Sequence, residues 1–461
     1  MYRKTIHIHF VGIGGIGMSG IAELLANLGY QVSGSDLGQS RITENLTRQG
    51  CTVYAGHRRQ WMRGADVVVT SSAIAADNPE VLAAQDLGVP VIMRAEMLAE
   101  LMRLKKFGIA IAGSHGKTST SSMVSWMMAQ AGLDPTIVIG GKVDSLGGNA
   151  KLGQGEFLVA EADESDGSFL KLSPVLEVIT NIDLEHLDYY RDIDHIKNTF
   201  LEFIDKVPFY GAAIICLDDP HVADILPAIK KRIITYGLTA QADLHAEQIS
   251  FDQGRVRFIV KCEGETLGEI NLAPPGMHNV YNALAAIGVG LELDIPFQVI
   301  ADALSCFAGV QRRMEHKGTI SGITVVDDYG HHPTEIRATL SAIKRAWPEK
   351  RLVVLFQPHR YSRTKALFKE FLTCFHQADV LVLTDIYAAS EEPIEGVSSE
   401  HLIDRIQQHG QRHTIYIGDL RELAARVRPL LKPGDLVLSL GAGTIVRAGE
   451  ELLSLLAEEK G

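Results

Sequence analysis

Residues 107–119 read FGIAIAGSHGKTS, an apolar run followed by a glycine-rich loop. The apolar run, residues 107–112, is predicted to form a strand, and apolar side chains recur at helical spacing behind the loop, from Met123 to Ala131. A loop between a strand and a helix N-terminus presents free backbone N–H groups and the positive end of the helix dipole to anions. The stretch therefore predicts an α/β fold with a loop that holds the phosphates of a nucleoside triphosphate.

The side chains of this loop suit ATP and a magnesium ion. Lys117 is expected to reach the terminal phosphates, and the hydroxyl of Thr118 is expected to bind Mg²⁺. The common Gly-x-x-x-x-Gly-Lys-Ser/Thr pattern fails at its first position, which is Ile111, so an ordinary glycine-rich turn remains the alternative. The residues expected to bind ATP here are Gly113, Ser114, His115, Gly116, Lys117, Thr118 and Ser119.

Composition limits the class of protein. At about 150 residues per domain, 461 residues suggest three domains, and a net charge of -12 argues against a general nucleic-acid binder. Five scattered cysteines without a Cys-x-x-Cys pair indicate neither a zinc site nor a disulfide framework, which favours a reducing cytoplasm. The chain passes directly from Met1 into the strand-like residues 6–11, and no apolar run approaches 18 residues, so we expect no membrane anchor.

The first predicted domain, residues 1–103, begins as a Rossmann-like βαβ unit. Gly12, Gly14 and Gly17 fit the dinucleotide fingerprint, and Asp36 ends the next strand where an acidic residue would meet a ribose. The fingerprint alone leaves three ligands or roles open: a nicotinamide or flavin dinucleotide, another nucleotide-like phosphate ligand, or a structural tight turn.

Two further domains follow. The central one, residues 104–310, is predicted to be a P-loop-type ATPase domain in which the short alternating runs of residues 244–270 form a small antiparallel sheet. The last, residues 311–461, alternates strands and helices again and is predicted to be a Rossmann-like α/β domain.

Polar residues at the carboxyl ends of the central strands are the candidates for metal binding, because ligands of open parallel sheets lie beyond those ends. Glu161 closes the strand predicted at residues 157–162, and His186 follows the strand predicted at residues 176–182. Thr118, Glu161 and His186 are therefore expected to share Mg²⁺ at the phosphates. A solvated acidic turn at residues 161–166 and a hydrogen-bonded loop histidine are the alternatives.

The third domain supplies cationic side chains. Arg312 and Arg313 stand at the domain junction, where a guanidinium can reach a γ-phosphate. Further polar clusters follow consecutive strands at residues 327–332 and 357–363, and in the second of them Arg360 and Arg363 are expected to hold a carboxylate or phosphate. For either arginine alone, ordinary surface charge is the alternative.

Taken together, these motifs resemble the Mur ligases of peptidoglycan synthesis. The resemblance rests on the loop at residues 113–119, the acidic run at 161–166, His278-Asn279 with Asn282, Arg312-Arg313, residues 327–332 and residues 358–361. It covers essentially the whole chain, with motifs in all three domains. It implies that the first domain binds the UDP part of a sugar nucleotide, the second binds ATP and metal, and the third closes over both.

The resemblance also implies roles for single residues. The catalytic residues it implies are Lys117, Glu161, His186 and Arg313. It adds Asn279, Asn282 and Arg313 to the ATP site and makes Thr118, Glu161 and His186 the metal ligands. The residues it implies for the sugar nucleotide and the amino acid are Gly14, Gly15, Gly17, Met18, Asp36, Ser71, His331, His359, Arg360 and Arg363.

The activity implied is ATP-dependent amide formation between the lactyl carboxylate of UDP-N-acetylmuramate and L-alanine through an acyl phosphate, by a cytoplasmic monomer or dimer. A ligase that adds a whole tripeptide to the same sugar nucleotide is the nearest alternative. A nicotinamide-dependent dehydrogenase would explain Gly12 to Gly17 but leave the ATP loop idle. A non-enzymatic ATP-binding switch would leave the Arg360 cluster unused.

Overall fold

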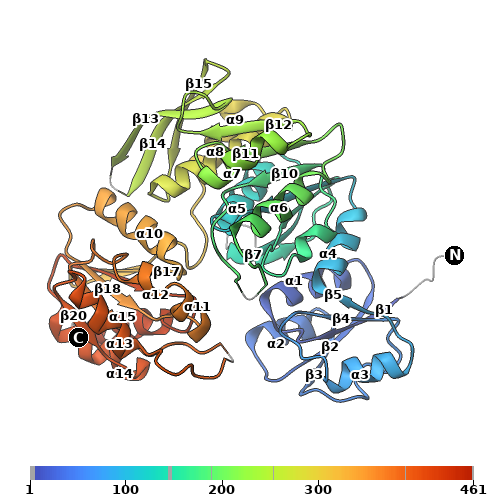
Figure 1. Cartoon of the computed structure of the whole chain (residues 1–461). Helices are drawn as coiled ribbons and strands as arrows, with labels where there is room; N and C mark the ends of the chain where they lie inside the picture. Colours follow the sequence, from blue (N-terminus) through green and yellow to red (C-terminus); the bar gives the residue numbers. More distant parts are fainter. Residues whose placement is uncertain (1–5, 144–147, 188, 253, 390, 459–461) are drawn as a thin grey trace. The chain divides into compact units, whose positions relative to one another are not determined.

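The computed structural model describes residues 6–143, 148–187, 189–252, 254–389 and 391–458. The chain folds into two compact units (Figure 1). The first comprises Met1–Glu247, Ile259–Ile270 and Tyr281–Phe307, and the second comprises Gln248–Phe258, Asn271–Val280 and Ala308–Gly461. Within the described ranges, no helix has the length and apolar character needed to cross a bilayer.

The first unit begins with a five-stranded parallel sheet of order β3-β2-β1-β4-β5, as expected for a Rossmann-like domain. Its central strands are apolar and buried, so their side chains form the core between the sheet and its helices. The strands are β1 (His7–Val11), β2 (Gln31–Asp36), β3 (Thr52–Ala55), β4 (Val67–Thr70) and β5 (Val91–Met93); the helices are α1 (Ile16–Asn27), α2 (Arg41–Arg48), α3 (Pro79–Asp86) and α4 (Arg94–Arg103).

The second sheet has ten strands in the order β15-β14-β13-β12-β11-β10-β6-β9-β7-β8. Its strands are β6 (Phe107–Ala112), β7 (Thr136–Val143), β8 (Gly148–Lys151), β9 (Phe157–Glu161), β10 (Leu176–Ile179), β11 (Ala212–Cys216), β12 (Ile233–Gly237), β13 (Leu244–Asp252), β14 (Arg255–Cys262) and β15 (Glu265–Leu272). The helical segments are α5 (Lys117–Gln130), η2 (Ser168–Lys171), α6 (Ile193–Ile204), α7 (Pro220–Ile225), η3 (Leu226–Ala228), α8 (Met277–Glu292) and α9 (Phe297–Ser305).

The strands predicted at residues 244–270 are present, but they extend the ten-stranded sheet instead of forming a sheet of their own. The joint is short: β13 pairs in parallel with β12 only where Leu244 and His245 face Tyr236 and Gly237. Beyond that point β13 continues to Asp252.

The second unit contains a six-stranded sheet of order β16-β17-β21-β18-β19-β20, parallel except for the β16–β17 pair. Separate cores cover its two faces, one built with α10, α12 and α13 and the other with α14 and α15, which is a doubly wound arrangement. Its strands are β16 (Glu315–Ile320), β17 (Ile323–Asp328), β18 (Leu352–Phe356), β19 (Val380–Leu383), β20 (Thr414–Tyr416) and β21 (Leu436–Leu440). Its helical segments are α10 (Pro333–Ala346), α11 (Tyr361–Ala366), α12 (Phe368–Phe371), α13 (Ser399–Gln408), α14 (Leu420–Val427), η4 (Arg428–Leu430) and α15 (Val446–Glu458).

Helix α4 connects the two sheets of the first unit. Its apolar residues share one core with α1 and with strands β6 and β9. The approach is close: a Cβ atom at Gly108 of β6 would lie 2.6 Å from Cγ of Met102 in α4. Glycine at this position therefore lets α4 lie directly on the strand that leads into the phosphate loop.

One buried acid stands out in the ten-stranded sheet. Glu177 of β10 lies between Ala110 of β6 and Ala213 of β11, is fully buried, and has no hydrogen-bond partner among the described residues. Burial raises its pKa well above 4.5 and so favours the neutral acid in the folded chain. A buried polar group without a partner destabilises the fold by about 1–3 kcal/mol.

We expect Glu177→Leu to raise the apparent melting midpoint, and to raise it more at pH 8 than at pH 5. Because the folded pKa lies above the unfolded one, the wild-type chain loses stability as the pH rises above about 4.5 toward the folded pKa, and the variant does not. Calorimetry at both pH values measures the difference. Glu156→Leu, at an exposed position, is the control and should change the midpoint little at either pH. An equal shift at both pH values would contradict the expectation.

Candidate active site

The phosphate loop joins β6 to α5, and its backbone requires glycine at two positions. Gly113 has φ +126° and Gly116 has φ +84°, both in the left-handed range. A Cβ atom at Gly113 would lie 2.1 Å from Oγ1 of Thr180, and one at Gly116 would lie 2.5 Å from Oδ1 of Asn282. The two glycines are therefore fixed by close neighbours as well as by backbone conformation.

Hydrogen bonds attach the loop to the segment that follows β10. The backbone N–H of His115 donates to Oδ1 of Asn181 at 2.8 Å, and Oγ1 of Thr180 donates to the carbonyl oxygen of His115 at 2.6 Å. The N–H of Asp183 donates to Oγ of Ser114 at 2.8 Å. Gly116 caps α5 without a side-chain hydrogen bond, so the first turn of the helix is built to receive an anion.

Lys117, the first residue of α5, lies folded over the loop. Its Nζ donates to the carbonyl oxygens of Gly113 at 2.6 Å and Ser114 at 3.0 Å, and to Oε1 of Glu164 at 2.9 Å. Burial alone would lower the pKa of Lys117, but Glu164 and Glu161 outweigh it and raise the pKa, so the ammonium stays charged. Burial raises the pKa of Glu164 to about 7, against the opposing effect of Lys117.

The predicted metal ligands fall into two groups. Oγ1 of Thr118 donates to Oε1 of Glu161 at 3.2 Å, and the other carboxylate oxygen of Glu161 accepts from the N–H of Gly140 at 2.8 Å. His186 lies instead with two other acids: its Nε2 is 3.7 Å from a carboxylate oxygen of Glu164 and 3.7 Å from one of Glu185.

Glu164, Glu185 and His186 form a possible cation site. One ligand atom from each lies within 4.8 Å of the other two. Carboxylate oxygens with one imidazole nitrogen are a donor set that fits a divalent cation. Sequence reasoning singled out neither Glu164 nor Glu185; their adjacency to the acidic run and to His186 was the only signal.

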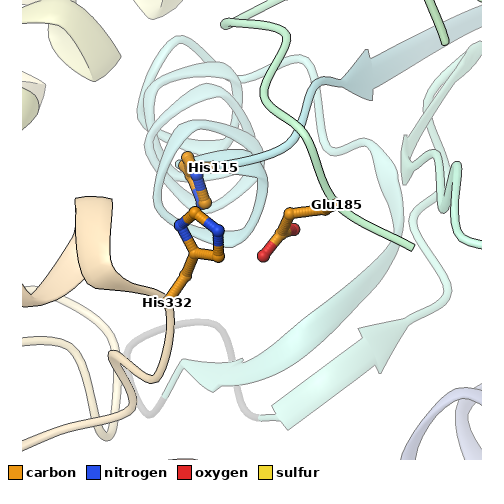
Figure 2. Close-up of side chains that lie close together, drawn as sticks. All are labelled: His115, Glu185 and His332. Carbon is orange, nitrogen blue, oxygen red and sulfur yellow. The ribbon is translucent and has the colours of Figure 1, made fainter. Parts of the chain in front are cut away.

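His115 and Glu185 approach one another within the first unit. Figure 2 shows His115 in the loop before α5 and Glu185 in the segment that follows β10. A ring nitrogen of His115 and a carboxylate oxygen of Glu185 lie within 4.8 Å, and Nε2 of His115 is 2.9 Å from Oδ2 of Asp183. The third residue labelled in Figure 2, His332, belongs to the second unit, where it caps α10.

The two asparagines expected near ATP lie on α8. Asn282 is buried, and its Oδ1 accepts from Oγ1 of Thr120 at 3.2 Å beside Gly116. The structure thus places Asn282 against the phosphate loop. Asn279 belongs to the second unit, where its side-chain amide donates to the carbonyl oxygen of Pro275 at 2.9 Å.

The N-terminal glycine loop joins β1 to α1. The N–H of Gly14 donates to Oδ2 of Asp36 at 2.9 Å, so this carboxylate already binds the loop. Gly15 is exposed and caps α1 without a side-chain bond, while Met18 is buried in the core. Ser71 follows β4, the parallel neighbour of β1, and therefore stands at the same edge of the sheet as the loop.

In the second unit, two arginines flank one aromatic ring. The guanidinium carbons of Arg312 and Arg313 lie 5.0 Å and 5.1 Å from the ring centroid of Tyr329. Arg312 also donates from Nε to Oδ2 of the buried Asp327 at 3.1 Å and from Nη2 to the carbonyl oxygen of Gly441 at 2.6 Å. These bonds give Arg312 a structural role, whereas Arg313 is partly exposed, with Nη1 3.7 Å from Glu335.

The residues expected to bind a carboxylate lie together at the end of β18. The ring of His359 stacks on Tyr387, with centroids 5.6 Å apart, and lies 5.7 Å from the ring of His331. Nη1 of Arg363 donates to Nδ1 of His359 at 3.0 Å. Burial, followed by the charges of His331 and Arg363, lowers the pKa of His359 to about 3, so His359 is neutral and accepts this bond.

Arg360 differs from its neighbours in being exposed and in having a left-handed backbone, with φ +71°. Its N–H donates to the carbonyl oxygen of Tyr387 at 2.8 Å, which holds the strained turn in place. The cluster of His331, His359, Arg360 and Arg363 therefore combines a neutral imidazole with two guanidinium groups, a combination suited to a carboxylate.

Comparison with known proteins matches most of the chain, from residue 7 to residue 443, to one family. Three family models match it in sequence order: the catalytic domain of the Mur ligase family at residues 7–106, the Mur ligase middle domain at 111–290, and the glutamate ligase domain of Mur ligases at 312–443. The chain belongs to the Mur ligase family. Mur ligases are ATP-dependent, in agreement with the loop that precedes α5.

Several Mur ligases match the chain over its full length. A UDP-N-acetylmuramate--L-alanine ligase of Desulfotalea psychrophila is 69% identical over 459 residues, with 100% of each chain covered, and one of Geobacter sulfurreducens is 59% identical over 461 residues, again with full coverage. The crystal structure of a UDP-N-acetylmuramate-alanine ligase of Thermotoga maritima matches with a TM-score of 0.85 and 28% identity, covering 98% of this chain and 100% of that one. A murein peptide ligase of Psychrobacter arcticus matches with a TM-score of 0.73 and 25% identity, covering 98% of each.

Proposed function

We propose that this chain joins L-alanine to UDP-N-acetylmuramate in an ATP-dependent ligase reaction of peptidoglycan precursor synthesis. The observation that carries the proposal is the full-length likeness to ligases named for these two substrates, 69% identical in one case. The phosphate loop of this chain supports the ATP-dependent half, because Gly113, Gly116 and Lys117 have the geometry that phosphates require.

We propose three working regions with the bounds 1–103, 104–310 and 311–461. The first would bind the UDP moiety at the glycine loop of residues 12–17, the second would bind ATP, and the third would receive a carboxylate. We further propose that the protein works in the cytoplasm as a monomer or dimer, without nucleic-acid or membrane partners. Its cysteines within the described ranges are free thiols, which suits a reducing compartment.

The proposed cofactor is Mg²⁺. The oxygen atoms of Thr118 and Glu161, and the carboxylates of Glu164 and Glu185 in the separate group, supply the hard oxygen donors that this ion prefers, and His186 adds one imidazole nitrogen. Bound there, Mg²⁺ would neutralise charge on the phosphates. The coordinating role of each residue is part of the proposal.

The proposal gives the residues of the candidate site separate roles in binding and catalysis. Lys117 would exchange its bonds to Gly113, Ser114 and Glu164 for the terminal phosphates of ATP and neutralise the charge that develops during transfer. The proposal assigns Arg313 to the γ-phosphate, Asn279 and Asn282 to the adenine side of the nucleotide, and the cluster of His331, His359, Arg360 and Arg363 to a substrate carboxylate.

The chemistry proceeds in two steps. The lactyl carboxylate attacks the γ-phosphorus of ATP and releases ADP, which gives an acyl phosphate. The neutral amine of L-alanine then attacks the acyl carbon, the nitrogen loses one proton to solvent, and the C–O bond breaks so that inorganic phosphate leaves with the electron pair. Positioning of the amine and exclusion of water favour amide formation over hydrolysis.

We expect phosphate release from ATP to depend on both UDP-N-acetylmuramate and L-alanine, and to be much weaker with glycine or L-serine. A coupled phosphate assay with each amino acid in turn measures this. Equal or greater turnover with the tripeptide L-alanyl-γ-D-glutamyl-diaminopimelate would favour the recycling ligase instead. Hydride transfer to a nicotinamide without phosphate release would overturn the ligase proposal altogether.

A further inference from the structure

The glycine loop proposed to bind the diphosphate of the sugar nucleotide carries no positive side chain of its own. From Gly12 to the end of α1 at Asn27 the sequence contains neither lysine nor arginine. Its one charged neighbour that binds the loop is acidic, because Oδ2 of Asp36 accepts from the N–H of Gly14. Any positive side chain that neutralises a diphosphate placed there therefore comes from another element.

Arg94 is such a side chain. It is the first residue of α4, and its guanidinium lies against the first turn of α1: a Cβ atom at Gly17 would be 3.1 Å from Nη1 and 3.2 Å from Cδ of Arg94. A Cβ atom at Gly17, the third glycine of the fingerprint, would press on this side chain, so glycine lets the Arg94 guanidinium lie close to the first turn of α1. With 24% of its side chain exposed, Arg94 is also accessible from solvent.

A guanidinium at this position is electrostatically unfavourable by itself, because the N-terminus of α1 is the positive end of the helix dipole. Asp163, from the acidic run after β9, offsets this by accepting a hydrogen bond from Nη2 of Arg94 at 2.9 Å. Arginine carries five N–H donors, so this bond leaves donors for an anionic ligand.

Asp163 also places the ion pair next to the ATP loop along the chain. The residue after it, Glu164, accepts a hydrogen bond from Lys117 of that loop. A second contact holds the same turn of α1, since the side-chain amide of Asn149 in β8 donates to the carbonyl oxygen of Ile16 at 2.8 Å. The first turn of α1 is thus fixed from the ATP-binding side of the first unit.

We propose that Arg94 binds the diphosphate of the uridine nucleotide at the first turn of α1, and that Asp163 positions its guanidinium there. The inference rests on the proposed function, because it takes the uridine nucleotide as the ligand of the glycine loop. It adds a binding residue from α4 and a positioning residue from the segment after β9.

Two substitutions separate this role from that of a structural brace, because both break the ion pair but only one removes the cation. Arg94→Gln is expected to weaken UDP binding at least about tenfold and to flatten its dependence on salt, since a screened attraction is lost. Asp163→Asn keeps the guanidinium and is expected to weaken UDP binding about threefold. The matched control is Arg103→Gln, at the exposed far end of α4, which should bind UDP within about twofold of the wild type.

Calorimetric titration of the full chain with UDP and, separately, with a non-hydrolysable ATP analogue gives the result. We expect ATP-analogue affinity to change by less than about twofold in Arg94→Gln. Equal losses of UDP affinity in the Arg94 and Asp163 variants, or a parallel loss of ATP-analogue affinity, would show that Arg94 has only a structural role. Either result would overturn the inference. Unchanged UDP affinity in Arg94→Gln would overturn it as well. Failure of the wild-type chain to bind UDP or UDP-N-acetylmuramate would instead count against the proposed function.

Discussion

Lys117→Ala is expected to lower kcat for amide formation at least about a hundredfold. Gly113, Ser114 and Glu164 hold the Lys117 ammonium over the phosphate loop, at the first residue of α5. A charge placed there stabilises the transferring phosphoryl group more than the bound ground state, so its loss falls mainly on kcat. Steady-state rates at saturating ATP, UDP-N-acetylmuramate and L-alanine measure the change.

The same loss is expected for Glu161→Ala, because Glu161 binds the hydroxyl of Thr118 at the end of β9. Binding of UDP-N-acetylmuramate should remain nearly intact in both variants, which also shows that they fold. Lys106→Ala removes an exposed lysine at the start of the same region and should leave kcat unchanged within about twofold. A variant with near-normal kcat at saturating substrates would remove its residue from the proposed site.

The sequence predicted best those elements whose signal is local. The strand predicted at residues 107–112 is apolar throughout and coincides with β6, because an apolar run bounded by glycine or polar residues specifies a buried parallel strand. The glycines of the phosphate loop could also be recognised in the sequence, because the loop needs their backbone conformations and few other residues adopt them.

What the sequence could not predict depends on distant partners. Strands β8 and β16 contain glycine and polar residues and become strands through pairing with β7 and β17. The extension of the ten-stranded sheet by β13 likewise follows from a two-residue joint with β12. Nothing in the pattern of residues 244–270 separates such an extension from a small sheet.

The candidate site shows the same division. The rule that strand ends meet at one edge of a sheet places Thr118 and Glu161 close together, and in the structure their side chains share a hydrogen bond; their metal binding stays a prediction. Sequence analysis assigns no role to Glu164, which lies in the acidic run at residues 161–166, yet its side chain is almost completely buried against Lys117. Glu164 contacts Lys117 because the segment after β9 brings it to the phosphate loop. The spacing of residues in the sequence does not specify the path of that segment.

Oxygen from the substrate carboxylate is expected to appear in the inorganic phosphate. If Lys117 and the metal ligands support transfer of the γ-phosphoryl group to the lactyl carboxylate, the new P–O bond is made by a carboxylate oxygen. The amine of L-alanine then breaks the C–O bond of the acyl phosphate, and that oxygen leaves with the phosphorus. UDP-N-acetylmuramate labelled with ¹⁸O in both carboxylate oxygens should therefore deliver one labelled oxygen to each phosphate released.

Mass spectrometry of the released phosphate measures the transfer, and the label should reach it only when ATP, Mg²⁺ and L-alanine are all present. A ligase that activates its substrate as an adenylate would release pyrophosphate and carry the label into AMP, so the two routes are separated by where the ¹⁸O is found. Lys117→Ala is the matched control, because it should lower the amount of phosphate and of amide together while each phosphate that forms still carries one label. Unlabelled phosphate accompanying normal amide formation would exclude the acyl phosphate even if both substrates are correctly assigned, since the oxygen that the carboxylate loses would then have gone to an acceptor other than the γ-phosphorus.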